Sequence, residues 1–144
     1  MTLSVEEIDI VRASFREISR ERARLPEVFY RRLFEVAPEL RSLFKHDMAA
    51  QNVKMMNTLG AIVARIHDSA ALRPMVIDLA RRHAGYGVSP RQYYIVGNAM
   101  LWALERVQGD SFTAEIGAAW AAAYSELAEV MVDAAYGERQ DNVA

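Results

Sequence analysis

Apolar residues recur along this chain at spacings of three and four, which is the period of amphipathic helices. Ile8, Val11 and Phe15 form the first such series, and Phe29 and Leu33 begin the second. Glycine does not occur before position 60, and no stretch alternates β-branched with polar residues as a strand would. The pattern therefore predicts an all-α protein.

Capping signals and helix breakers divide this pattern into about seven helices of unequal length. Ser4 and Glu7 have the spacing of a capping box, and Ser89, Pro90 and Gln92 combine a capping box with a proline in the first helical position. We expect the helices at about residues 5–18, 21–36, 38–44, 50–67, 74–83, 90–107 and 114–136. Their unequal lengths disfavour a symmetric four-helix bundle.

Length and composition indicate one domain over residues 1–144. Of these residues 52% are apolar and 25% charged, a balance typical of a globular protein with a single core. We expect the core to span about residues 4–136 and the tail, 137–144, to fray. Acidic residues interrupt the most apolar segment, and the N-terminus lacks a basic and apolar leader pattern. We therefore expect no membrane span and a cytoplasmic location.

Charge and cysteine content exclude several functions. The formal net charge is −2, and the paired arginines at 31–32 and 81–82 stand apart from other basic residues. A nucleic-acid-binding face needs denser clustering, so we expect no nucleic acid partner. The chain has no cysteine, which excludes disulfides, thiolate catalysis and cysteine-based zinc sites.

The stretch LARRHAGYGVSPRQYY, residues 79–94, places His83 where a short helix is expected to end. Pro74 marks the expected start of that helix, and Gly85 can supply a left-handed C-cap. A histidine at this place has two possible roles. It can lie on the surface, favoured by the negative end of the helix dipole, or it can point into a pocket as an iron ligand.

A second candidate feature is one face of the helix expected at 50–67. Gln51, Lys54 and Met55 share this face, and Leu59 continues it as an apolar strip. Such a face suits an apolar slot that is entered from its edge, as an aromatic cofactor carrying carboxylates would enter it. Tyr30 adds a polar tip to an otherwise apolar helix face, and its hydroxyl would need a partner if buried.

Four segments in this order resemble bacterial haemoglobins, the globin domains of flavohaemoglobins, and neuroglobin. They are FYRRLFEVAPELRSLF (29–44), RRHAGYGV (81–88), SPRQYYIVG (89–97) and AAWAAAY (118–124). The resemblance implies a globin fold, a three-over-three helical sandwich in which the fourth helix is reduced or absent. It also implies haem b as cofactor and reversible binding of O2, with CO and NO as further diatomic ligands.

The resemblance assigns a role to individual residues. His83 matches the proximal iron ligand, and Tyr30 and Gln51 match a distal pair of hydrogen-bond donors for O2. The residues implied to contact the cofactor are Phe44, Lys54, Met55, Arg82, Val88 and Tyr93. Lys54 is a candidate to pair with a haem propionate. His46 and Arg82 are two further candidates for such a pair. Hydrogen bonds to a charged acceptor contribute about 1.5–3 kcal/mol each, so we expect tight O2 binding.

The chain departs from flavohaemoglobins in two respects. Ala135 stands where they carry a glutamate that orients the proximal tyrosine and polarises the histidine. We therefore expect the His83 imidazole to be less strongly polarised, which disfavours peroxidase-like chemistry. No flavin or nicotinamide domain is expected beyond Ala144, so turnover would need an external reductase.

Three functions therefore remain. The leading one is an oxygen-binding globin for storage or delivery. The main catalytic alternative is a nitric oxide dioxygenase that converts O2 and NO to nitrate. A haem-free interaction module or a sensor belongs to another class, and a haem-free module has no reason to keep His83 together with Tyr30 and Gln51.

Overall fold

The computed structural model describes residues 3–44 and 47–137. Within them lie six α-helices: α1 (Val5–Ile18), α2 (Arg24–Val36), α3 (Met48–Arg65), α4 (Ser69–Gly85), α5 (Pro90–Gln108) and α6 (Ala114–Val132). Short 3-10 helices cover Ser19–Glu21, Pro38–Leu43 and Gly109–Ser111, and a π-helical turn covers Asp133–Gly137. The described residues form no strand, so the prediction of an all-α protein is confirmed.

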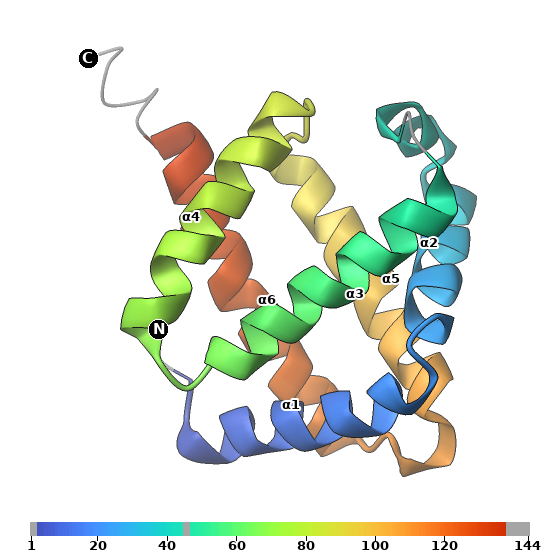
Figure 1. The fold of residues 1–144 in the computed structure, drawn as a ribbon, viewed down its shortest axis with the longest axis vertical. Coiled ribbons are helices and arrows are strands. Elements are labelled where there is room, and N and C mark those ends of the chain that lie inside the picture. Colours follow the sequence, from blue (N-terminus) through green and yellow to red (C-terminus); the bar gives the residue numbers. More distant parts are fainter. Residues whose placement is uncertain (1–2, 45–46, 138–144) are drawn as a thin grey trace.

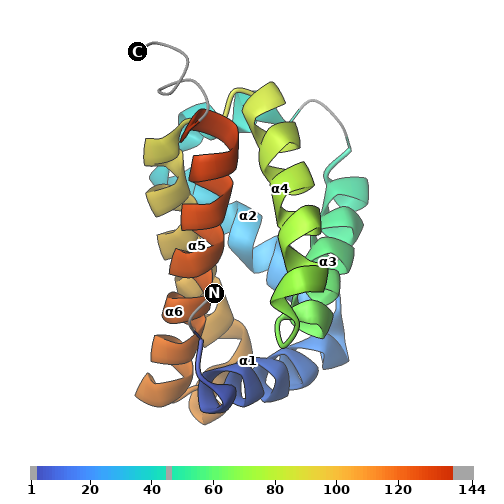
Figure 2. The same cartoon turned by 90° about the vertical axis from the view of Figure 1, so that its left-hand side faces the viewer.

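The helices pack in the three-over-three arrangement that was predicted (Figures 1 and 2). Helices α3 and α4 lie on one side of the molecule and α5 and α6 on the other, while α1 crosses at one end of both. Helix α2 packs along α5, and α6 contacts both α1 and α4. Only residues 44–47 separate the 3-10 helix Pro38–Leu43 from α3, which agrees with a reduced or absent fourth helix.

Helix α4 corrects the expected boundaries at both ends. It begins at Ser69 because the side chain of Asp68 accepts the Ala71 N–H at 3.2 Å, so Pro74 lies inside the helix and does not start it. At the other end Gly85 is still helical, and Gly87 adopts the left-handed conformation with φ of +87°. The cap signal of Asp68 therefore outweighs the proline signal.

The other boundaries deviate less. Helix α2 begins at Arg24, three residues later than expected, because the chain first forms the 3-10 helix Ser19–Glu21. Helix α3 begins at Met48, where Asp47 caps it by accepting the Ala49 N–H at 3.2 Å. Both capping boxes are present as predicted, at the starts of α1 and α5.

The apolar core is divided into two clusters. The larger cluster includes Leu25, Leu33 and Leu104, and it draws on α1, α2, α3, α5 and α6. The smaller cluster includes Leu72 and Val76 of α4, and residues of α3, α5 and α6 complete it. Helices α3, α5 and α6 thus contribute to both clusters.

A buried hydrogen-bond network and one close helix–helix approach fix the relative positions of three helices. The hydroxyl of Ser14, which is 2% exposed, accepts the Trp120 indole N–H at 2.9 Å and donates to Gln108. Gly97 allows close approach of α5 and α6, because a Cβ there would lie closer than 3.0 Å to the Tyr124 ring. These contacts bring α1, α5 and α6 together at defined positions.

Among the described helices, none combines the length and the hydropathy that a bilayer crossing requires.

Candidate functional site

Tyr30 of α2 and Gln51 of α3 form a partly buried polar pair. The Tyr30 side chain is 6% exposed, and Gln51 Nε2 donates to its hydroxyl oxygen at 3.0 Å. Burial raises the pKa of Tyr30, and the hydrogen bond from Gln51 opposes this only in part. The expected partner for the Tyr30 hydroxyl is confirmed. Because the oxygen accepts from Gln51, the Tyr30 O–H proton remains available to a third group.

Aromatic rings surround this pair on the side of α2. The Tyr30 ring lies 5.3 Å from the Phe44 ring and 6.0 Å from the Phe34 ring, centroid to centroid. Phe44 follows the 3-10 helix Pro38–Leu43 and is only half-buried. Met55, one turn beyond Gln51 on α3, is likewise half-buried against the larger core cluster. The polar pair therefore borders an apolar surface that protein covers incompletely.

His83 lies in the last turns of α4 and is half-buried. Its Nδ1 lies 2.8 Å from the Leu79 carbonyl oxygen, which can only accept, so Nδ1 carries the proton. Burial lowers the pKa of His83, and the cations Arg82 and Lys54 lower it further, although the bond to Leu79 acts in the opposite direction. The imidazole is therefore neutral near pH 7, with a lone pair on Nε2. A lowered pKa does not suit a histidine that serves as a positive charge at a helix end.

Tyr93 of α5 supplies a buried hydroxyl on the side of α4 and α6. Its side chain is 7% exposed, and its hydroxyl has no hydrogen-bond partner among the described residues. Burial, with a smaller contribution from Tyr136, raises the pKa of Tyr93 to about 12. The Tyr136 hydroxyl itself donates to the carbonyl oxygen of Val88, whose side chain packs on the smaller core cluster.

Among the described residues, the groups that shift the pKa values of His83 and Tyr93 include no Asp or Glu, and Ala135 packs on the smaller core cluster. Asp133, which begins the same π-helical turn, is exposed. The expectation that Ala135 leaves the His83 imidazole less strongly polarised stays a prediction.

The expected charged residues differ in their surroundings. Lys54 is exposed and close enough to His83 to affect its pKa. Arg82 is also exposed, but its Nε lies 3.3 Å from an Asp78 carboxylate oxygen one helical turn earlier. His46 and the tail 138–144 lie outside the described residues.

The structure joins the predicted residues into two groups. Tyr30 contacts both Gln51 and Phe44 at the larger cluster, whereas the chain around His83, including Val88 and Tyr93, borders the smaller one. The described residues hold no group of three or more His, Asp or Glu side chains that could bind a metal ion. A single free imidazole nitrogen suits a metal that arrives with most of its ligands already in place.

Two partners were missed by sequence reasoning. They are the Leu79 carbonyl, which orients His83, and Asp78, which pairs with Arg82. Both lie four residues before their partner on α4, and this spacing is the signal that could have identified them.

The comparisons with known proteins decide the family. The family model described as Globin matches residues 27–131, well over half of the chain and including every predicted site residue. The chain belongs to the globin family.

The most informative relatives of this globin are flavohaemoproteins. The flavohaemoprotein of Rhizobium meliloti (strain 1021) is 34% identical over 126 residues, which covers 85% of this chain and 31% of the relative. That of Vibrio cholerae is 32% identical over 144 residues, which covers 96% of this chain and 36% of the relative. This globin therefore spans about a third of the length of these relatives.

A solved structure matches the globin almost completely. It is an engineered carbene transferase made from a nitric oxide dioxygenase candidate of Rhodothermus marinus. The two share 28% identity with a TM-score of 0.87, and the match covers 99% of this chain and 100% of the other. The resemblance that the four sequence segments indicated is confirmed at the level of family and fold.

Proposed function

We propose that this globin binds haem through His83 and takes up O2 reversibly. His83 carries this proposal: it is half-buried and neutral, and its Nδ1 is held by the Leu79 carbonyl at 2.8 Å. A backbone carbonyl that fixes one ring nitrogen orients the other for metal binding.

The residues present fit a haem group. Besides the free imidazole nitrogen, they offer the half-covered apolar surfaces of Phe44, Met55 and Val88 and the unpartnered buried hydroxyl of Tyr93. Haem, when bound, supplies an iron atom that takes diatomic ligands such as O2, CO and NO. Haem b is the form we propose, because covalent attachment of a c-type haem requires cysteines and the chain has none.

Each side chain then has a distinct task. In this role His83 would hold the iron through Nε2, and the free O–H of Tyr30 would donate to a partly negative diatomic ligand. Gln51 already directs an N–H at the Tyr30 oxygen, so it acts mainly by holding Tyr30 in place. Lys54 is the better candidate for a propionate, because Arg82 is paired with Asp78. Phe44 and Met55 keep water from the ligand.

Haem titration and ligand binding test this function. Hemin is added to the purified protein, and absorption spectra are recorded in the ferric, ferrous, O2-bound and CO-bound states. We expect one haem per chain and a Soret band that shifts with each ligand. A protein that takes up no hemin, or whose ferrous form does not change its spectrum in O2, would refute the proposal and leave a haem-free interaction module.

A nitric oxide dioxygenase is the second candidate, and the match to the Rhodothermus marinus structure favours it. The reaction joins NO, O2 and one electron to form nitrate, so a reductase would have to supply the electron. The absence of a carboxylate among the groups that act on His83 argues against strongly tuned redox chemistry. Nitrate formation from NO and O2, in the presence of a chemical reductant and at a rate set by protein concentration, would establish this activity.

A further inference from the structure

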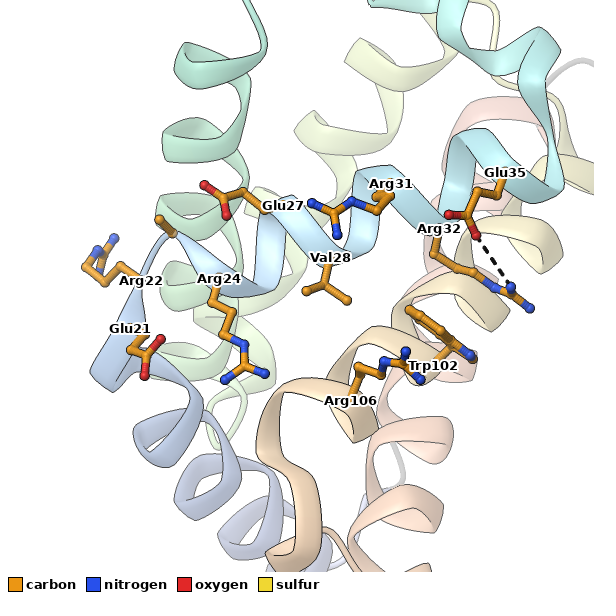
Figure 3. A pocket seen from close by; sticks show the side chains of 11 residues that line it. Glu21, Arg22, Arg24, Glu27, Val28, Arg31, Arg32, Glu35, Trp102 and Arg106 are labelled. Atoms are coloured by element: carbon orange, nitrogen blue, oxygen red, sulfur yellow. Dashed lines mark ion pairs between the residues drawn. The ribbon is translucent and has the colours of Figure 1, made fainter.

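A hollow of about 830 Å3 lies outside the candidate haem site, between the start of α2 and the end of α5 (Figure 3). None of the predicted site residues lines it. The charged residues in its lining are Arg22, Arg24, Arg31, Arg32, Arg106, Glu21, Glu27 and Glu35. Five guanidinium groups and three carboxylates thus line the hollow, so its charged lining is positive overall. The whole chain, in contrast, carries a net charge of −2. The positive charge of the hollow is local.

Few of these arginines are neutralised within the protein. Arg32 lies 3.7 Å from a Glu35 carboxylate oxygen, and Arg22 donates to the Asn57 side-chain oxygen at 2.8 Å. Arg24, Arg31 and Arg106 make no hydrogen bond or ion pair with any described residue. Three guanidinium groups therefore present free donors to the hollow.

Trp102 holds two of the cations close together. The guanidinium carbons of Arg32 and Arg106 each lie 4.8 Å from the centre of the Trp102 ring, so cation–π attraction fixes both (Figure 3). Their separation is therefore below the screening length of about 10 Å at 0.1 M salt, and the two charges repel each other. An anion bound close to both guanidinium groups would relieve this repulsion.

We propose that this hollow binds a small molecule carrying two or more phosphate groups. A guanidinium presents paired N–H donors that match phosphate oxygens, and a multivalent phosphate can engage several of the free arginines at once. The volume falls within the range of small-molecule sites, about 300–1,000 Å3. The apolar lining is limited to Ala23, Val28 and Trp102, which disfavours an apolar ligand.

Calorimetric titration tests the site with two probes, pyrophosphate and ATP, at low ionic strength. The haem-loaded protein is compared with variants Arg106→Gln and Arg31→Gln, and with Arg12→Gln, which removes an exposed arginine of α1 outside the hollow. We expect each hollow variant to weaken binding at least tenfold and Arg12→Gln to change it less than twofold. Arg106→Lys, which keeps the charge but loses the planar fork, should fall between these values.

Each result has a defined meaning. Equal affinity for the two probes indicates that the phosphates alone are recognised, whereas tighter binding of ATP shows that the nucleoside also contacts the hollow. No binding of either probe at millimolar concentration overturns the proposal. An equal loss in all three glutamine variants also overturns it, because net charge and not the hollow would then control binding. Since Arg31 is exposed and makes no contact that a fold would need, Arg31→Gln remains informative if Arg106→Gln does not fold.

Discussion

Substituting Tyr30→Phe tests the distal side of the site. The change removes one buried hydroxyl and leaves the ring, with its contacts to Phe44 and Phe34, in place. In the proposed role this hydroxyl donates to the ligand while it accepts from Gln51. We therefore expect the substitution to release O2 faster with little change in the fold.

The size of the effect follows from the hydrogen bond that is lost. A bond to a charged acceptor contributes about 1.5–3 kcal/mol, and each 1.4 kcal/mol is a factor of ten in rate, so the O2 dissociation rate should rise about tenfold to a hundredfold. Carbon monoxide is less polar, so its release should change about threefold or less.

The assay is stopped-flow displacement of O2 by CO from the ferrous protein. Tyr94→Phe, which removes a hydroxyl from a side chain that is 78% exposed, is the matched control and should leave the rate unchanged. Gln51→Leu should also speed release, but in the Tyr30→Phe background its effect should largely disappear, because Gln51 acts through Tyr30. An unchanged O2 dissociation rate in Tyr30→Phe would refute the role given to this hydroxyl.

Three further predictions concern stability. Gly97→Ala places a Cβ within 3.0 Å of the Tyr124 ring and should lower the free energy of unfolding in urea by about 1–3 kcal/mol. Ser14→Ala leaves the Trp120 indole N–H without its acceptor and should cost about 1–3 kcal/mol in the same assay. The Tyr93 phenol ionises near pH 10 when unfolded but only at about pH 12 when folded, so thermal stability should fall between these pH values. Tyr93→Phe should reduce that loss without abolishing it, because burial also raises the pKa of Tyr30 and of Tyr124.

Matched variants control each of these changes. Gly85 is helical, and a Cβ added there would have no neighbour within 4 Å, so Gly85→Ala should not lower the free energy of unfolding. If Gly85→Ala costs as much as Gly97→Ala, the clash with the Tyr124 ring does not explain the loss in Gly97→Ala. Ser125→Ala, on the exposed side of α6, should be neutral, and no loss in Ser14→Ala would show that the buried network is not needed. A loss above pH 10 that is as large in Tyr93→Phe as in the unsubstituted protein would assign it to other groups.

The fold was predictable where short-range signals decide it. The capping boxes at Ser4 and Ser89 fixed the starts of α1 and α5 because cap hydrogen bonds involve residues only three apart. The start of α4 was wrongly predicted at Pro74, because proline is common at the first helical position. The side-chain cap supplied by Asp68 was the stronger signal. The choice between Gly85 and Gly87 for the left-handed residue depended on where α4 ends, which packing controls.

For the candidate site, sequence reasoning could propose residue types but not their hydrogen bonds. That Tyr30 needs a partner follows from its burial, whereas the direction of the bond from Gln51 depends on how α2 and α3 meet. The Arg82–Asp78 pair follows from spacing along α4, so it could have been anticipated. The hollow around Trp102 could not, because its arginines come from α2 and α5, which are far apart in sequence.

The central claim is that the His83 imidazole binds the haem iron. The most direct test is the absorption spectrum of His83→Gly after haem loading, with and without added imidazole, beside His67→Gly, in which an exposed histidine is removed. We expect His83→Gly to lose the spectrum of the ferrous five-coordinate form, imidazole to restore it, and His67→Gly to match the unsubstituted protein. A ferrous spectrum in His83→Gly that is the same as that of the unsubstituted protein would contradict the assignment of His83 as the iron ligand.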